Sequence, residues 1–267
     1  MTDSFLYYNR CMKKLTDDEI HALRYYEGVV SPQDQNRPFW SDPKAYVTFN
    51  SLFFADTVTE EARCEEGRKL NACITDDPSS VIQMIKNLYT ACLKYEHQPL
   101  HVYRVERLAD FQMFCSEGRF TSFISTSRAG FLENYEDKYD LVLMDIAVST
   151  DVPCIDYIQM VPGREKEEES EVLIAPYSEI KIIQEKLPAE LRTIKDGRGK
   201  PPAVYCHVNV KAGRGKKTDI QFAAPVHVEA ARRYYQSLNM HADVDEEDRA
   251  LYLQYKSIIR SYTEGLI

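Results

Sequence analysis

The sequence predicts an α+β fold, with helices gathered at the two ends of the chain and strands gathered in the middle. Three observations support this prediction. Apolar residues at helical spacing dominate the first hundred residues, short β-branched and aromatic runs dominate residues 101–210, and helical spacing returns after residue 225. Separate blocks of helices and strands are typical of α+β proteins, whereas α/β proteins alternate the two along the chain.

The N-terminal helices have recognisable ends. Thr16-Asp17-Asp18-Glu19 is a capping box, whose first and last side chains each satisfy a backbone donor, and Gly28 is a typical residue for ending that helix. A second helix is expected to begin near residue 42. A longer helix begins at residue 78 and places an apolar stripe on one face between residues 81 and 93, which indicates a core-facing helix.

Seven short runs with the composition of strands follow these helices. They occupy residues 101–106, 120–126, 140–148, 154–160, 171–174, 178–184 and 203–210. The chain then returns to helix over residues 226–240 and 245–263. The sequence contains no Gly-rich phosphate loop of the Rossmann or P-loop kind, so those nucleotide-binding folds are not expected.

Composition narrows the class of protein. The net charge of −9 argues against general affinity for nucleic acid, which needs a basic surface. Residues 192–217 reverse that sign locally; a solvated basic loop is the ordinary interpretation, and a contact surface is the alternative. The seven cysteines are scattered, with no Cys-x-x-Cys pair, which predicts neither a disulfide framework nor a metal site and is typical of a reducing compartment.

The sequence predicts a soluble, cytoplasmic protein. Its first residues include an acid and lack the apolar region of a secretory signal. No apolar run approaches the length of a membrane span. If the protein acts in another cell, it is delivered there by a route that the sequence does not reveal.

Three polar motifs occur in a fixed order, each at the edge of a strand-like run. They are Val102-Tyr103-Arg104, Ser125-Thr126-Ser127 and Glu169-Ser170-Glu171. If the last motif is extended, its two carboxylates point to the same side, because side chains alternate along a strand. Two such carboxylates can stabilise a developing cation, although a charged run by itself is more typical of a solvated loop. The order of the three motifs is what favours a functional site.

This order resembles that of the mono-ADP-ribosyltransferases of the Arg-Ser-Glu class, which includes clostridial-type toxins and arginine-specific transferases. The resemblance covers about residues 15–182, and the last third of the chain has no counterpart in it. A sister class, the diphtheria-type enzymes, has His in place of the Arg, and His101 lies nearby. Because His101 and Arg104 would face opposite sides of a strand, the Arg class is favoured.

The resemblance implies a two-sheet mixed β-sandwich core of the ADP-ribosyltransferase type, within a single domain over residues 1–267. Residues 1–98 would form a helical region, residues 99–210 the NAD-binding β core, and residues 211–267 a C-terminal helical extension. NAD would be the co-substrate, and no metal is expected.

The resemblance also implies roles for individual residues. Glu171 would bind the ribose 2′-hydroxyl and stabilise positive charge at C1′, and Arg104 would bind the pyrophosphate with its planar guanidinium. Ser125 would hold Glu171 or the ribose in place. One carboxylate is enough, because nicotinamide is already a cationic leaving group and needs no general acid. The structural alternatives are an ion pair of Arg104 with Glu106 or Asp110, and a strand-end role for Ser125.

Further residues are expected to line the NAD site, namely Tyr103, Thr126, Ser127 and Phe131. Residues 128–138 correspond to the loop that closes over nicotinamide in the family. Within that loop Phe131 or Tyr135 would either stack on the nicotinamide ring or pack under the loop.

The acceptor is predicted from Glu169. An arginine side chain has no free lone pair, so it needs a carboxylate to orient it and draw off a proton before it attacks C1′. Family members with Glu two positions before the catalytic Glu modify arginine, so Glu169 suggests an arginine acceptor on a protein. A nucleic-acid acceptor stays open because of the basic residues 192–217.

The function predicted is therefore NAD-dependent mono-ADP-ribosyl transfer, a glycosyltransferase reaction, by a toxin or effector with a neutralising or delivery partner. Two other classes of function stay open. A NAD glycohydrolase would use Arg104, Ser125 and Glu171 in the same way with water as the acceptor. A binding module would keep the fold without the chemistry.

Overall fold

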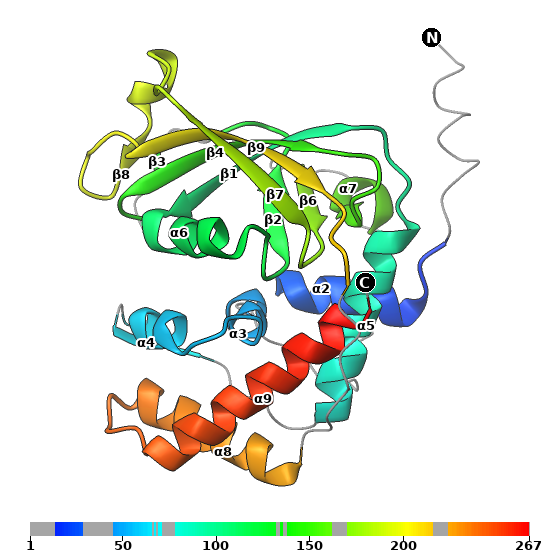
Figure 1. Ribbon diagram of the computed structural model, residues 1–267, viewed down its shortest axis with the longest axis vertical. Coiled ribbons are helices and arrows are strands. Elements are labelled where there is room, and N and C mark those ends of the chain that lie inside the picture. Colours follow the sequence, from blue (N-terminus) through cyan, green and yellow to red (C-terminus); the bar gives the residue numbers. More distant parts are fainter. Residues whose placement is uncertain are drawn as a thin grey trace. The chain divides into compact units, whose positions relative to one another are not determined.

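The computed structural model describes residues 14–28, 45–65, 67, 69–70, 78–131, 134–135, 138–161, 170–215 and 224–266. The chain divides into two compact units: a β unit, Met1–Lys14 with Ala91–Arg214, and a helical unit, Leu15–Thr90 with Gly215–Ile267. The predicted α+β class is confirmed, with strands in the middle of the chain and helices towards both ends (Figure 1). The division of one domain at residues 98 and 210 stays a prediction.

The β unit is built on one seven-stranded mixed sheet, in the order β5-β6-β2-β1-β4-β9-β7. Neighbouring strands are antiparallel except β4 and β9, which are parallel. A second sheet joins β3 and β8 in parallel. The strands are β1 (Leu100–Arg107), β2 (Ile124–Ser127), β3 (Asn134–Tyr135), β4 (Leu141–Val148), β5 (Cys154–Asp156), β6 (Glu171–Ile174), β7 (Glu179–Glu185), β8 (Lys195–Asp196) and β9 (Val204–Lys211).

The large sheet curls back on itself. In the chain segments that lead into β2 and β7, the Phe120 N–H donates to the Ser178 carbonyl at 2.9 Å and the Ile180 N–H donates to the Gly118 carbonyl at 3.0 Å. A flat sheet would keep these segments apart, because three strands lie between β2 and β7 in the sheet order. The expected two-sheet sandwich therefore takes the form of a single curled sheet.

Three features of the β unit differ from the expected pattern of elements. The strand run over 154–160 ends early, because the Asp156 side chain accepts a hydrogen bond from the Gln159 N–H at 3.2 Å and caps the short helix α7 (Tyr157–Met160). The two-residue strands β3 and β8 are too short to produce a periodic signal. Two helical segments were not expected, α6 (Leu108–Glu117) and the 3-10 helix η3 (Glu190–Thr193).

The helical unit joins the N-terminal helices to the last two helices of the chain. The predicted capping box is confirmed, since the Glu19 N–H donates to Thr16 Oγ1 at 3.2 Å and the Thr16 N–H donates to Glu19 Oε2 at 2.7 Å. The expected helix start near residue 42 lies outside the described residues. The helices are α2 (Asp17–Glu27), α3 (Ala45–Ser51), α4 (Val58–Glu65), α5 (Pro78–Lys94, whose last turn belongs to the β unit), α8 (Pro225–Asn239) and α9 (Glu246–Glu264).

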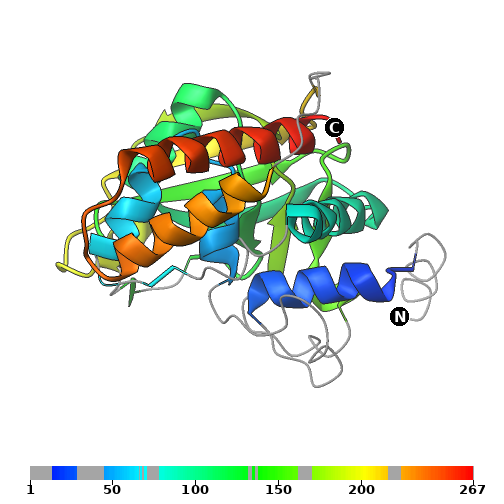
Figure 2. The same cartoon turned by 90° about the horizontal axis from the view of Figure 1, so that it is seen from below.

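A buried ion pair lies where α4 meets the C-terminal helices, of which α8 and α9 run side by side (Figure 2). Lys256 Nζ on α9 donates to Glu60 Oε1 on α4 at 2.7 Å, and the two side chains are 1% and 0% exposed. The Tyr252 hydroxyl donates to the same carboxylate oxygen at 2.9 Å and contacts the Tyr235 hydroxyl of α8. Burial lowers the pKa of Lys256, and the Glu60 carboxylate opposes that change. This network joins the last third of the chain to the N-terminal helices.

Glu60→Ala is expected to destabilise the protein by about 3–5 kcal/mol, because it leaves the Lys256 ammonium buried without a carboxylate. Replacing both partners, Glu60→Leu with Lys256→Met, removes the buried charges together and is expected to recover most of that loss. Urea unfolding of the full chain, followed by circular dichroism, measures both. A loss below about 1 kcal/mol for Glu60→Ala would be that of a solvated surface pair and would contradict the buried network.

Candidate active site

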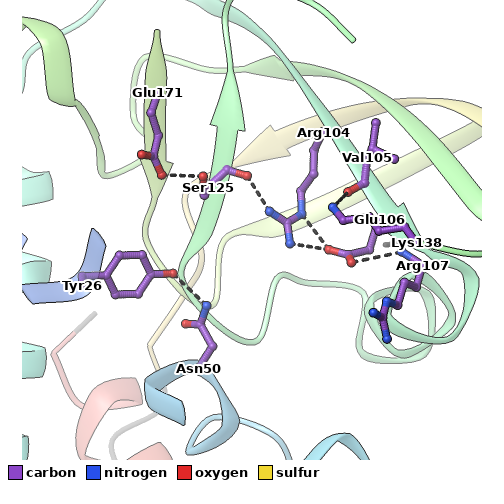
Figure 3. A network of polar contacts seen from close by, with 9 residues as sticks. All are labelled: Tyr26, Asn50, Arg104, Val105, Glu106, Arg107, Ser125, Lys138 and Glu171. Carbon is purple, nitrogen blue, oxygen red and sulfur yellow. Dashed lines mark hydrogen bonds and ion pairs between the residues drawn. The ribbon is translucent and has the colours of Figure 1, made fainter. Parts of the chain in front are cut away.

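Ser125 and Glu171 lie on neighbouring strands and are joined by a hydrogen bond. Strands β2 and β6 pair with Ser127 opposite Glu171 and Ser125 opposite Leu173, so Ser125 and Glu171 are diagonal neighbours on one face of the sheet. The Ser125 hydroxyl donates to Glu171 Oε1 at 2.5 Å (Figure 3). Both side chains are half-buried, so the carboxylate is held in one orientation at a site that solvent partly reaches.

Arg104 of β1 extends this network. Its Nη1 donates to the main-chain carbonyl of Ser125 at 2.6 Å (Figure 3). Its Nε donates to Glu106 Oε2 at 2.7 Å, and its Nη2 contacts the same oxygen. The structure therefore brings the arginine, the serine and the second glutamate of the three sequence motifs into one chain of contacts.

The ion pair between Arg104 and Glu106 was the structural alternative for Arg104, and it is present, with a buried carboxylate and a half-buried guanidinium. The Glu106 side chain is 7% exposed. Burial opposes ionisation of Glu106, yet the Arg104 and Lys138 charges outweigh that penalty and hold its pKa below the ordinary value. The Glu106 carboxylate is therefore an ionised, buried anchor for the Arg104 guanidinium.

Three of the residues expected in the NAD site have structural contacts beside this network, namely Tyr103, Thr126 and Ser127. Tyr103 stands opposite Ser127 in the pairing of β1 with β2. The Ser127 hydroxyl oxygen accepts a hydrogen bond from the Ala129 N–H at 3.0 Å, so it shapes the turn that follows β2. Thr126 is buried, and its hydroxyl donates to the Val172 carbonyl at 2.7 Å. Thr126 thus ties β2 to β6.

Phe131 and Tyr135 pack against the sheet. The Phe131 ring lies edge-on to the Tyr103 ring, with centroids 5.1 Å apart. The Phe131 and Tyr135 side chains pack against an apolar cluster formed by residues of β1, β4 and β9 together with Ile194. Tyr135 belongs to β3 and is paired with Asp196 of β8. In this structure the loop aromatics take the packing role that was one of their two expected roles.

Glu169 lies outside the described residues, so its expected place beside Glu171 stays a prediction. The described chain resumes at Ser170, which has a left-handed backbone with φ of 49°. Ser170 is followed directly by Glu171 at the start of β6. The Ser170 carbonyl accepts a hydrogen bond from the Arg128 N–H at 3.2 Å.

Within the basic segment 192–217, residues 196–200 are organised around one buried carboxylate. Asp196 accepts hydrogen bonds from the Arg198 N–H at 2.9 Å and the Lys200 N–H at 2.8 Å. The Arg198 guanidinium pairs with Asp140 at 2.6 Å and lies over the Tyr139 ring. Arg198 is therefore engaged within the protein, which favours a structured turn over an open basic loop at this point.

Sequence reasoning did not find two polar clusters of the β unit. Asp145, within the apolar run of β4, contacts His101 of β1 and also faces His207 of β9, with 3.6 Å between His207 Nδ1 and Asp145 Oδ2. Arg128 pairs with Asp156, with 2.9 Å between Nη2 and Oδ2. Charged residues inside or directly after apolar strand runs were the available signal, because such residues are seldom buried without a partner.

In the described ranges, no group of three or more His, Cys, Asp or Glu side chains is placed to hold a metal ion. None of the helices in those ranges combines the length and the apolar character that a membrane crossing requires.

No protein-family model and no curated protein matches the chain. Solved structures do, at low identity. ADP-ribosyltransferase Vis from Vibrio splendidus, in complex with agmatine, is 16% identical over 76% of this chain and 78% of Vis, with a TM-score of 0.40. C2-I, the enzymatic component of the C2 toxin of Clostridium botulinum, is 15% identical over 74% of this chain and only 44% of C2-I, with a TM-score of 0.39. The catalytic domain of VahC from Aeromonas hydrophila is 14% identical over 74% of this chain and 100% of that domain, with a TM-score of 0.38. Identities and TM-scores this low do not identify the reaction of this chain, which depends on its own side chains.

Glu106→Gln is expected to lower the melting temperature at neutral pH, and this difference from the wild type is expected to close in acid. The folded-state pKa of Glu106 is depressed, so its ionised form stabilises the fold above the ordinary value of 4.5 and stops doing so as the pH falls through the lower, folded value. Melting curves of both proteins between about pH 7 and about pH 3 measure the gap. The exposed Glu190→Gln is the matched control. A gap that stays constant with pH would contradict the buried ion pair.

Proposed function

We propose that the protein cleaves the bond between nicotinamide and ribose in NAD and transfers ADP-ribose to a macromolecular acceptor. The observation that supports this most strongly is the 2.5 Å hydrogen bond from Ser125 to Glu171, in one network with Arg104. A carboxylate held by a hydroxyl, beside a guanidinium, suits a reaction in which positive charge develops at a sugar carbon next to a pyrophosphate.

Glu171 is the proposed catalytic residue. Its carboxylate accepts a hydrogen bond from the ribose 2′-hydroxyl and stabilises positive charge at C1′ as the glycosidic bond breaks. The bonding electron pair leaves with the nicotinamide nitrogen, so nicotinamide departs as a neutral molecule and needs no proton. Ser125 restricts the Glu171 side chain before NAD binds, which lowers the entropy lost in reaching the transition state.

Arg104 has two proposed roles. Through the Ser125 carbonyl it holds the strand that carries the catalytic hydroxyl. Its guanidinium also supplies positive charge for the pyrophosphate. Because Glu106 shares that charge, the phosphate gains less from Coulomb attraction here than it would from an isolated guanidinium. Tyr103, Ser127 and Phe131 are proposed to line the NAD site nearby, with Thr126 supporting the strand pair beneath it.

Arginine on a protein is the proposed acceptor, with Glu169 as the base. The acceptor nitrogen forms the new bond to C1′, and Glu169 takes the guanidinium proton so that charge balances. We propose that the protein acts as a toxin or effector in the cytoplasm of the cell that contains its target, with a partner that delivers or neutralises it. Transfer to nucleic acid and hydrolysis by water are the competing outcomes.

Labelled NAD incubated with the protein and whole-cell lysate tests this function. Label that remains bound after washing and is released by protease supports transfer to protein, whereas release by nuclease indicates a nucleic-acid acceptor. Free ADP-ribose as the main product would indicate hydrolysis. No loss of NAD with any lysate would contradict the proposed function and favour a binding module.

Glu171→Gln is expected to fold normally and to lose NAD cleavage by about a hundredfold or more, the scale for removing one charge that stabilises a transition state. The exposed Glu190→Gln is the control for loss of a carboxylate elsewhere in the β unit. Nicotinamide release, measured by chromatography, compares the two. Near wild-type turnover in Glu171→Gln would exclude the assigned role.

Glu169→Gln is expected to separate transfer from hydrolysis. The amide can still form hydrogen bonds but cannot take a proton, so transfer should fall by about 10²–10⁴-fold while hydrolysis continues. Free ADP-ribose and macromolecule-bound label are measured on one preparation, with Glu167→Gln as the neighbouring control. A parallel fall of both products would place Glu169 in the NAD site, and a fall in Glu167→Gln alone would move the base to that position.

A further inference from the structure

Strand β6, which begins with Glu171, lies between β5 and β2. Ser127 of β2 stands opposite Glu171, and Asp156 of β5 stands opposite Val172. The ends of the two flanking strands are therefore level with the first residues of β6. A contact between Asp156 and the end of β2 crosses the first residues of β6 on the face of the sheet that Val172 shares, opposite to the Glu171 side chain.

Such a contact is made by Arg128, the residue that follows Ser127. Its Nη2 lies 2.9 Å from Asp156 Oδ2 and also donates to the Tyr95 hydroxyl at 3.2 Å. The Asp156 side chain is 3% exposed, so solvent competes little for the ion pair. The Arg128 side chain thus links β2 to β5 across the start of β6.

The Arg128 backbone makes a second link, to Ser170. The Arg128 N–H donates to the Ser170 carbonyl at 3.2 Å, and Ser170 has a φ of 49°. Residues other than Gly, Asn and Asp seldom adopt this left-handed backbone conformation, because their Cβ atom crowds the backbone. Such a conformation persists only where the surroundings impose it, and here it sets the direction in which the chain enters β6 at Glu171.

We propose that Arg128, Asp156 and Ser170 are positioning residues that hold the Glu171 carboxylate in its contact with Ser125. The ion pair fixes the two strands that flank β6, and the left-handed turn at Ser170 aims the first side chain of β6. This inference rests on the proposed function, since it assigns these residues to the step that Glu171 performs. None of the three is proposed to touch NAD.

Two consequences distinguish positioning from a merely structural role. A loosened Glu171 lowers kcat, because a displacement of about 1 Å at a reacting group can cost about a hundredfold in rate. The KM for NAD should change little, because the contacts that bind the dinucleotide stay in place. A purely structural defect would instead lower the melting temperature and the fraction of active protein together.

Ser170→Gly gives the sharpest test. Glycine adopts positive φ without a steric penalty, so the variant should melt at the wild-type temperature or above. It also frees the turn, so kcat should fall by about three- to tenfold with an unchanged KM for NAD. Ser170→Ala is the matched control, because it removes the hydroxyl but keeps the Cβ atom that restricts the turn, and it should keep most of the wild-type kcat. An unchanged kcat in Ser170→Gly would overturn the proposal.

Arg128→Gln and Asp156→Asn test the ion pair. Asparagine still caps α7, so Asp156→Asn removes the charge and leaves the helix start intact. Each single variant is expected to lower kcat, and the double variant should be no slower than the slower single one, because both remove the same link. Additive losses in kcat would contradict the shared link. If Arg128→Gln does not fold, Ser170→Gly decides the question.

Failure of this proposal and failure of the proposed function give different results. If the wild-type protein does not cleave NAD, the function fails. Crystal structures of the wild type and Ser170→Gly then decide the positioning role. Loss of the contact between Ser125 Oγ and Glu171 in the variant would support it, and the same contact in both proteins would overturn it.

Discussion

The candidate site depends on the contacts of the Arg104 guanidinium. It joins a buried carboxylate, Glu106, to the main-chain carbonyl of Ser125, and Ser125 in turn holds Glu171. A buried carboxylate is costly unless it is paired, and a guanidinium can meet two acceptors at once because its donors form a rigid fork. The guanidinium that pairs with Glu106 therefore also ties Ser125 to β1.

A second ion pair completes the support on the other side of the site. Arg104 links β1 to β2, whereas Arg128 and Asp156 link β2 to β5 across the first residues of β6, on the face of the sheet opposite to the Glu171 side chain. Preorganised sites need their supporting residues held as firmly as the reacting ones. The half-buried Glu171 receives that support without being removed from solvent, which leaves it accessible to a ligand.

In the helical unit, too, a buried charge is paired with a charge of opposite sign. Lys256 and Glu60 are both buried, and they come from helices that lie far apart in the sequence. The C-terminal helical extension was expected over residues 211–267, and that boundary stays a prediction. The helices α8 and α9 belong to the same compact unit as α2, α3 and α4, and the buried Lys256 ammonium has its carboxylate partner on α4.

The sequence by itself determined the local features of this protein. The α+β class, the capping box at Thr16 and the two C-terminal helices follow from backbone preferences and periodicity over a few residues. The order of the three motifs is part of the sequence itself. Only the tertiary structure decided the hydrogen bond from Ser125 to Glu171, 46 residues apart, the burial of Glu106 and the link from Arg128 to Asp156. The physical reason is that strand register and the partners of buried charges depend on how the whole sheet packs, and local preferences do not encode that packing.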